Sequence, residues 1–308
     1  MSAPAVFATA YAKINLTLDV LGKREDGYHE LASVMQTIAL HDTLLLRPSA
    51  RNEIGCYCDM PDLSGPDNLA LRAAQLLKAE PGAAGRGVAI ELRKGIPTQA
   101  GLGGGSSDAA CVLNALNGLW DLDLDVAALE AFGARLGSDV PFCIRGGTAL
   151  MAGRGERVTP LPPAEPFWIV LVKPPLPVPT AEVFHRLTPD RYTGGAATAA
   201  VAAAIRAREP LPLGVLANAL EATVLAAYPA IAQAFDALRS AGAPVVRMSG
   251  SGPTLYAPFR ALAEALRVHA ALCDSGMSAW LTHTVSSPME GATWPPYGSA
   301  RPPGLPDR

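Results

Sequence analysis

The 308-residue sequence contains few charged residues, few cysteines and no long apolar segment. Charged residues make up only 17% of the chain, and the formal net charge is −3. This overall charge does not favour binding to nucleic acid or to an anionic membrane surface, so an anionic ligand would need a local basic site. Hydrophobic residues make up 49% of the chain, which is enough for a packed core and unlike a disordered chain.

The five cysteines do not follow the spacing of a disulfide framework or a zinc site. They are odd in number, scattered along the chain and without a C-x-x-C pair. Cys56 and Cys58 alternate on an apparent strand. They would therefore share one face as small core residues, which we favour over a metal pair. Reduced thiols are typical of cytosolic proteins, so we expect a cytoplasmic location.

Targeting and membrane-spanning segments are also missing from the pattern. Residues 1–12 lack a basic region followed by a long apolar core, so we expect no signal peptide. The longest apolar-looking run, residues 196–205, is alanine-rich and far too short to span a bilayer.

What is present is a mixture of strands and helices without internal repeats or the regular alternation of a doubly wound sheet, which predicts an α+β fold. Strands are predicted at residues 5–22, 33–40, 43–48, 87–96, 147–158, 167–174 and 278–285, with a turn at His41–Asp42 and a strand–turn–strand over 244–259. Helices are predicted at residues 69–80, 107–119, 126–136, 180–187, 196–208, 213–226, 230–241 and 261–272. Proline-rich residues 160–166 indicate a boundary between domains 1–164 and 165–287, followed by a disordered tail, 288–308.

The stretch 94-KGIPTQAGLGGGSSDAAC-111 follows a predicted strand and precedes a predicted helix. Glycines without Cβ atoms let the free N–H groups of a helix N-terminus wrap around phosphate oxygens. Ser106, Ser107 and Asp108 would open the helix, where their side chains can cap it, contact phosphate or hold Mg²⁺. We favour this anion cradle over the alternative, a flexible surface loop beside a capped helix. The stretch is neither a Walker A loop nor a dinucleotide fingerprint, because Gly-Lys-Ser/Thr is missing and Ser106 stands where the last glycine would be.

The segment from Pro97 to Ala110 resembles the phosphate loop of the GHMP kinases, which include galactokinase, homoserine kinase and mevalonate kinase. Two other stretches match that family, 12-AKINLTLDVLGKREDGYHEL-31 and 249-SGSG-252. The resemblance implies an N-terminal ATP-binding α/β domain with S5-domain-2-like topology and a C-terminal ferredoxin-like α+β domain.

The combination of these stretches with 137-GSDVPFCIRGGTA-149 resembles one branch of the family, which is distinguished by Gly27-Tyr28-His29. That branch implies ATP-dependent phosphorylation of the 2-hydroxyl of a cytidine diphosphate sugar alcohol, in the non-mevalonate route to isoprenoid precursors. The alternatives are another GHMP kinase, of the homoserine or mevalonate type, or a non-catalytic nucleotide-binding protein of the same fold. The sequence leaves open whether the protein is a monomer or a homodimer.

Within this resemblance Lys13 and Asp139 occupy the catalytic positions. Asp139 would accept or orient the proton of the substrate hydroxyl, and Lys13 would stabilise charge on the transferred group. Taken alone, Lys13 could be an edge lysine that protects a sheet, and Asp139 could start a turn before Val140-Pro141.

The resemblance also implies the substrate contacts. Tyr28 would stack on a cytosine ring, His29 would hydrogen-bond its edge, and Phe184 would cover its other face. Asn15 and Thr180 would contact the sugar alcohol or its diphosphate. The alternative makes Tyr28 and His29 a polar hairpin tip and Phe184 a helix core residue.

For ATP, Asn68 would contact the adenine, or serve as a plain helix N-cap, or both. The turn at Gly250–Gly252 would close over the triphosphate, or be an ordinary tight hairpin. Mg²⁺ is implied by the chemistry, with Ser107 or Asp108 as its protein contact. The implied ATP-binding residues are Asn68, Pro97, Gly101, Leu102, Gly103, Gly104, Gly105, Ser106, Ser107, Asp108, Gly250 and Ser251.

Overall fold

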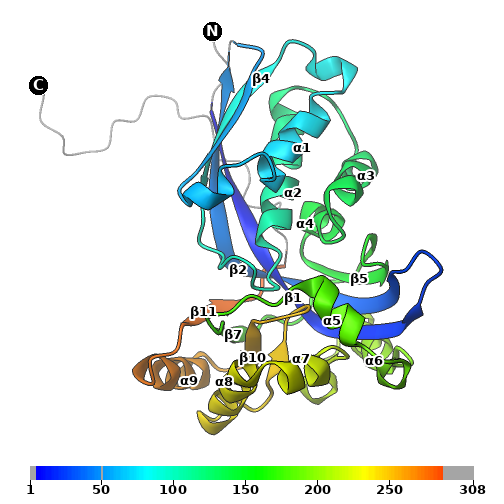
Figure 1. The fold of residues 1–308 in the computed structure, drawn as a ribbon, viewed down its shortest axis with the longest axis vertical. Helices are drawn as coiled ribbons and strands as arrows, with labels where there is room; N and C mark the ends of the chain where they lie inside the picture. Colours follow the sequence, from blue (N-terminus) through cyan, green and yellow to red (C-terminus); the bar gives the residue numbers. More distant parts are fainter. Residues whose placement is uncertain (1–4, 50, 287–308) are drawn as a thin grey trace, which may run out of the picture.

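The computed structural model describes residues 5–49 and 51–286, so the predicted tail 288–308 lies outside the described residues. The chain forms two lobes, each built from a sheet covered by helices (Figure 1). This mixed architecture confirms the predicted α+β class.

The first lobe is built on a seven-stranded sheet with the order β3-β4-β2-β1-β8, in which β5 pairs with β2 and β6 pairs with β5. Its strands are β1 (Val6–Lys23), β2 (His29–Ser49), β3 (Ile54–Cys58), β4 (Gly87–Arg93), β5 (Thr148–Gly153), β6 (Arg157–Pro160) and β8 (Ala217–Asn218). Four helices cover the side of this sheet that faces right in Figure 1. They are α1 (Leu69–Leu77), α2 (Gly104–Leu119), α3 (Val126–Leu136) and α4 (Val140–Arg145).

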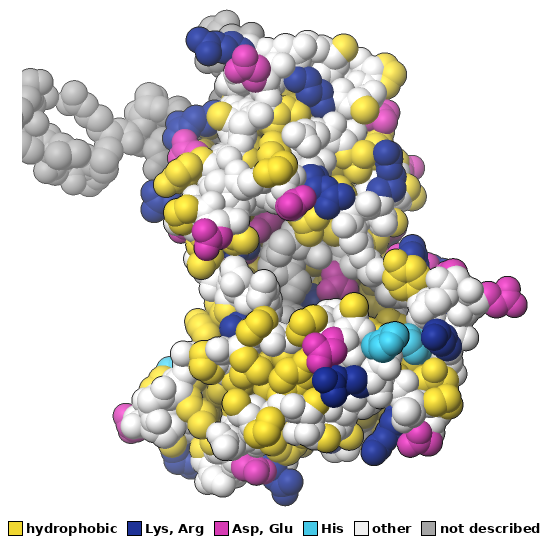
Figure 2. Space-filling model, viewed as in Figure 1, with side chains coloured by type: hydrophobic (Ala, Val, Ile, Leu, Met, Phe, Trp, Pro, Cys, Tyr) yellow, Lys and Arg dark blue, Asp and Glu magenta, His cyan; other side chains and the backbone are white. Residues whose placement is uncertain are grey.

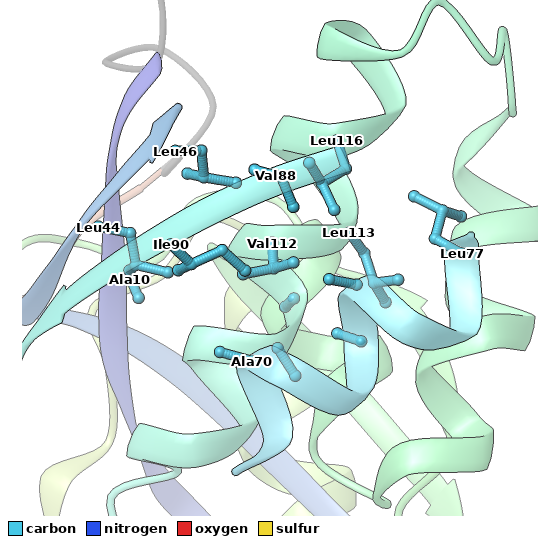
Figure 3. Packing of buried hydrophobic residues seen from close by; sticks show 14 of the residues in the cluster. Ala10, Leu44, Leu46, Ala70, Leu77, Val88, Ile90, Val112, Leu113 and Leu116 are labelled. Carbon is cyan, nitrogen blue, oxygen red and sulfur yellow. The ribbon is translucent and has the colours of Figure 1, made fainter. Parts of the chain in front are cut away.

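The core of this lobe lies between the sheet and helices α1 and α2. Leu44, Val88 and Ile90 from the strands meet Val112 and other aliphatic residues of the helices (Figure 3). Cys58 is fully buried in this cluster and Cys56 packs against it, as expected for small core residues, and all five cysteines are free thiols.

The predicted turn at His41–Asp42 is wrong, because β2 runs without interruption through these residues. His41 pairs with Tyr11 and Asp42 with Ala10, next to a shift in the register between β1 and β2. The buried Asp42 carboxylate accepts backbone hydrogen bonds from Gly95 and Ile96. Its polarity is therefore satisfied by a neighbouring loop, and the strand does not need to turn towards water.

The second lobe contains a four-stranded sheet with the order β11-β7-β10-β9. Its strands are β7 (Trp168–Val172), β9 (Arg247–Met248), β10 (Leu255–Phe259) and β11 (Ala279–His283), and the helices of the second half are α5 (Thr180–Arg186), α6 (Ala196–Arg206), α7 (Glu221–Ala227), α8 (Pro229–Ser240) and α9 (Leu262–Asp274).

The predicted helix over 213–226 is only partly correct. Residues 213–215 form a 3₁₀ turn, and β8 then pairs in parallel with β1 before α7 begins. The Asn218 side chain accounts for the break. Its amide donates to the carbonyl oxygens of Met248 and Gly250, and its oxygen accepts from the Leu220 N–H. These three bonds favour extended backbone at this point over helix.

The lobes are joined along β1 by a shared core and by buried hydrogen bonds. Ala12, Ile14 and Leu16 are fully buried in a cluster that also contains Ile169 and Tyr256 of the second lobe. The alternating residues Lys13 and Asn15 instead line a cavity, because successive side chains of a strand point to opposite faces. None of the described helices is long and apolar enough to cross a membrane.

Candidate active site

The glycine loop connects β4 to α2 in left-handed backbone that suits glycine. Gly101 and Gly103 both have φ of +72°, and Gly103 is the N-cap of α2. A Cβ on Gly101 would lie 2.9 Å from the Gly252 carbonyl oxygen, and one on Gly103 would lie 2.9 Å from Cγ of Lys13. Both glycines are therefore required by close packing as well as by backbone conformation.

Helix α2 begins at Gly104, three residues before the predicted start at Ser107. No side chain caps its N-terminus, so the predicted capping by Ser106, Ser107 or Asp108 does not occur. The first N–H groups of the helix are thus presented by glycines and Ser106, without a side chain competing for them. This arrangement suits an anion at the positive end of the helix dipole.

A cavity of about 340 Å³ lies against this helix N-terminus. The predicted ATP-binding residues that line it are Asn68, Pro97, Gly101, Gly103, Gly104, Gly105, Ser106 and Asp108. The Asn68 carboxamide oxygen caps α1 by accepting from Ala70 and Leu71. Asn68 therefore has the N-cap role and also lines this cavity.

The structure brings Lys13 of β1 and Asp139 together beside the glycine loop. Lys13 Nζ lies 3.1 Å from Oδ2 of Asp139 and donates to Asn15 Oδ1 at 2.9 Å. The Lys13 side chain is buried, whereas that of Asp139 is 34% exposed. Asp139 stands at the N-cap position of α4, a short helix that the sequence analysis missed, and its carboxylate makes no capping bond. That carboxylate is therefore held by Lys13 and not by the helix.

A larger cavity of about 870 Å³ contains this pair, at the hollow between the two lobes (Figure 2). All the predicted substrate residues line it: Asn15, Tyr28, His29, Thr180 and Phe184. Gly101 and Gly103 line both cavities. The two cavities therefore both border the glycine loop at these residues, beside Lys13.

The turn at residues 249–252 closes against the same loop from the second lobe. The Ser249 hydroxyl donates to the Gly101 carbonyl oxygen at 2.9 Å, and the hydroxyls of Thr180 and Ser251 are 2.7 Å apart. Gly250 and Ser251 line the larger cavity, so the turn borders the predicted substrate side as well as the loop.

The aromatic residues meet in a way that the sequence did not indicate. The rings of His29 and Phe184 stack on each other, with centroids 5.1 Å apart and an interplanar angle of 29°. Tyr28 is 56% exposed. Burial lowers the pKa of His29, and nearby Lys23 acts in the same direction, so this imidazole is neutral at neutral pH and can both donate and accept.

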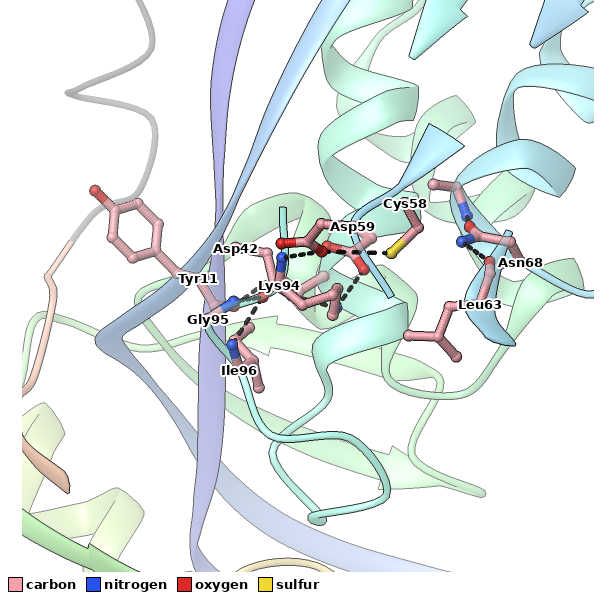
Figure 4. A network of polar contacts seen from close by, with 12 residues as sticks. Tyr11, Asp42, Cys58, Asp59, Leu63, Asn68, Lys94, Gly95 and Ile96 are labelled. Carbon is pink, nitrogen blue, oxygen red and sulfur yellow. Dashed lines mark hydrogen bonds and ion pairs between the residues drawn. The ribbon is translucent and has the colours of Figure 1, made fainter. Parts of the chain in front are cut away.

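A buried ionic cluster of Lys94, Asp42 and Asp108 was not predicted from the sequence (Figure 4). The Lys94 ammonium bridges the two carboxylates, with Oδ2 of Asp108 at 2.6 Å. This links β2, the start of the glycine loop and the first turn of α2. The only sequence signal was a lysine at the end of an apolar strand, and its partners lie far away in the chain.

The residues around the loop offer little direct coordination to Mg²⁺. The buried Ser107 hydroxyl donates to the Tyr11 carbonyl oxygen at 2.6 Å and lines neither cavity. The Asp108 carboxylate is held by Lys94. Across the described residues, no three His, Cys, Asp or Glu side chains gather as a metal centre. The donor set fits an Mg²⁺ ion only if phosphate and water oxygens supply most of its ligands.

Two sequence profiles match the chain, "GHMP kinases N terminal domain" over residues 68–147 and "GHMP kinases C terminal" over residues 201–276. The chain is 48% identical over 253 residues to the 4-diphosphocytidyl-2-C-methyl-D-erythritol kinase of Pelotomaculum thermopropionicum, covering 82% of this chain and 88% of that one. It is 45% identical over 250 residues to the enzyme of the same name from Geobacillus sp. WCH70, covering 80% and 86%.

Solved structures show the same relationship. A crystal structure of 4-(cytidine 5'-diphospho)-2C-methyl-D-erythritol kinase superposes with a TM-score of 0.78 at 37% identity, covering 90% of this chain and 98% of that one. A homoserine kinase from Cytophaga hutchinsonii superposes with a TM-score of 0.71 at 18% identity, covering 92% and 96%, which shows a shared fold.

Proposed function

The chain belongs to the GHMP kinase family, and from this premise we propose that it phosphorylates the 2-hydroxyl of 4-diphosphocytidyl-2-C-methyl-D-erythritol with ATP. The products would be the 2-phosphate and ADP, in the non-mevalonate route to isoprenoid precursors. The observation that carries the proposal is that two cavities border the glycine loop at Gly101 and Gly103, with Lys13 and Asp139 lining the larger one. The identity of the proposed substrate comes from the similar proteins, which are named as kinases of this compound.

The smaller cavity is the proposed ATP site. The triphosphate would lie against the N–H groups at the start of α2, where the loop glycines remove steric obstruction. Asn68, which lines this cavity, would contact the adenine while it also caps α1. The γ-phosphate would then point towards the Gly101–Gly103 junction and Lys13.

Phosphoryl transfer requires positioning of the hydroxyl and stabilisation of the charge on the transferred group. Asp139 has the partial exposure needed to accept or orient the hydroxyl proton. The buried Lys13 ammonium, fixed by Asp139 and Asn15, would stabilise the charge at low reorganisation cost. Mg²⁺, carried by the triphosphate and water, would neutralise phosphate charge.

The cytidine end would lie between the aromatic residues of the larger cavity. A third ring does not fit between His29 and Phe184, whose centroids are 5.1 Å apart. Cytosine would therefore stack on the exposed ring of Tyr28 and on the outer face of the His29–Phe184 pair. The edge of the neutral His29 ring would stay available for a hydrogen bond.

We further propose a cytosolic location, from the five free thiols. We also propose that residues 1–164 and 165–287 form two domains, whose cleft contains the reaction centre.

An ADP-release assay across a panel of alcohols tests the function. We expect turnover with the cytidine diphosphate substrate and none with homoserine or mevalonate. A second measurement, thermal unfolding with CMP or CDP, should show stabilisation by either nucleotide. Turnover of homoserine or mevalonate without any cytidine effect would show a different GHMP kinase, and ATP binding without turnover of any alcohol would show a non-catalytic protein.

A further inference from the structure

Arg154 lies at the wall of the larger cavity, beside a predicted nucleotide-binding aromatic residue. Its guanidinium carbon is 4.7 Å from the centroid of the Tyr28 ring, which is cation–π distance. Both residues line the cavity. They come from two turns that are adjacent because Leu31, near the start of β2, pairs with Gly153 at the end of β5.

The turn that carries Arg154 is held by its own residues. Gly153 and Gly155 have φ of +74° and +102°, and the Arg154 N–H donates to Oε2 of Glu156 at 2.6 Å. A Cβ on Gly153 would lie 2.8 Å from both oxygens of that carboxylate. Glu156 therefore stabilises the turn through the Arg154 backbone, and the side chain of Arg154 is left to reach Tyr28.

The neighbouring arginines Arg24 and Arg157 form ion pairs, whereas the Arg154 guanidinium does not, and the cation Lys23 lines the same cavity. Arg24 pairs with Asp26 and Glu30, and Arg157 pairs with Glu30. Within residues 5–49 and 51–286, no carboxylate forms an ion pair with Arg154. This end of the cavity therefore carries a guanidinium that no described carboxylate pairs with directly, although the pKa of Asp26 is lowered mainly by its hydrogen bond with Arg24 and also by the charge of nearby Arg154.

We propose that Arg154 binds the diphosphate of the nucleotide substrate, an inference that rests on the proposed function. A guanidinium is planar, and its N–H groups point outwards in that plane. When one face of the guanidinium lies on an aromatic ring, these N–H groups can still donate two parallel hydrogen bonds to phosphate oxygens. Tyr28 thus orients Arg154 on one face and receives the base on its other face. Tyr28 and Arg154 would together bind the base and the diphosphate of the same ligand.

The test compares three ligands by isothermal titration calorimetry: CDP, CMP and cytidine. Arg154→Ala should weaken CDP binding by about 10- to 100-fold, as loss of a charged hydrogen-bonded contact does, and leave cytidine binding unchanged. The affinity for CMP should fall by less than the affinity for CDP. Arg154→Lys should fall between wild type and Arg154→Ala, because an ammonium lacks the planar fork. The matched control is Arg157→Ala, three residues on and paired with Glu30, which should bind all three ligands as wild type does.

Binding of a non-hydrolysable ATP analogue verifies that each variant is folded, and Arg154→Gln replaces Arg154→Ala if the latter is not. Equal CDP affinity in Arg154→Ala and wild type would overturn this inference and leave the proposed function intact. An equal loss for cytidine and CDP would also overturn it, because the contact would then be to the nucleoside. If wild type binds neither CDP nor cytidine, the proposed function and this inference are both wrong.

Discussion

At the scale of single residues, the proposed reaction would depend on the Asp139 carboxylate, which is partly exposed and paired with Lys13. Asp139 meets Lys13 at 3.1 Å and keeps 34% of its side chain accessible. Asp139→Asn retains the shape but removes the proton acceptor, so kcat should fall by about 10²- to 10⁴-fold. The affinity for ATP should change little, because Asp139 does not line the smaller cavity. Steady-state ADP release and nucleotide titration measure the two quantities, and a kcat within a few-fold of wild type would remove Asp139 from the mechanism.

Asp108 offers a second prediction at this scale, through the pH dependence of stability. Burial raises the pKa of Asp108 to about 7, whereas an unfolded carboxyl titrates near about 3.9. Between these values the folded protein holds a proton that the unfolded chain has released. The stability contributed by this proton is therefore fully present below about pH 4 and is lost as the pH rises to about 7.

Asp108→Asn removes this dependence, since the amide does not titrate. Relative to wild type, the free energy of unfolding of Asp108→Asn should rise between about pH 4 and pH 7, by at most about 1.4 kcal/mol per pH unit. Urea unfolding at a series of pH values measures it. Asp62→Asn, at an exposed carboxylate, controls for the loss of one negative charge. If the free energies of unfolding of wild type and Asp108→Asn change in parallel with pH across this range, the cluster around Lys94 does not hold the extra proton.

At the scale of elements, the glycine loop works because two other segments pack directly on it. Gly101 has φ of +72°, and a Cβ there would meet the carbonyl oxygens of Ser249 and Gly252. Gly101→Ala should therefore cost about 1–3 kcal/mol in backbone strain alone and sharply reduce turnover, because the loop borders both cavities. Thermal unfolding and the ADP-release assay measure these effects.

The control for this change is Gly118→Ala in α2, the helix that follows the glycine loop. Gly118 lies inside α2, and a Cβ there would meet no atom within 4 Å. The free energy of unfolding of this variant should be higher than that of wild type by about 0.5–1 kcal/mol, because alanine loses less conformational entropy than glycine in a helix. Its turnover should equal that of wild type. Equal stability and turnover in both variants would show that the loop tolerates a side chain at Gly101.

Elements with strong local signals could be predicted from the sequence. The helix over 126–136 was placed with its observed bounds, and in the structure the Asp125 side chain caps it by accepting a hydrogen bond from the Ala128 N–H. The break before α7 could not be predicted, since it depends on Asn218 bonding to residues thirty positions away. The glycine loop was predicted as an anion cradle from its own residues, whereas Lys13 and Asp139 were found through the resemblance to a family. The Lys94 cluster was not, because its partners are distant in sequence and each residue alone has an ordinary role.

At the scale of the whole molecule, the two lobes share β1 so closely that they should unfold together. The buried Asp19 carboxylate of β1 accepts hydrogen bonds from Thr193 and from the backbone and hydroxyl of Thr198. The Tyr256 hydroxyl of the second lobe donates to the Asn15 carbonyl oxygen at 2.9 Å. Residues 1–164 alone would therefore expose the apolar face of β1 and leave these polar groups without partners.

We accordingly expect one cooperative thermal transition for the full chain, which a non-hydrolysable ATP analogue and CDP each shift upwards as a whole. A ligand at about a hundred times its Kd adds about 2.7 kcal/mol to the stability of whatever unit it binds. If the lobes were independent, the ATP analogue would shift only one of two transitions, because its proposed cavity is lined entirely by residues of the first domain. Calorimetry with each ligand separates these outcomes. A single transition that moves with both ligands would mean that the cleft residues of the two lobes belong to one cooperative unit. Two transitions would mean that Thr180 and Phe184 can leave the site without unfolding of the glycine loop.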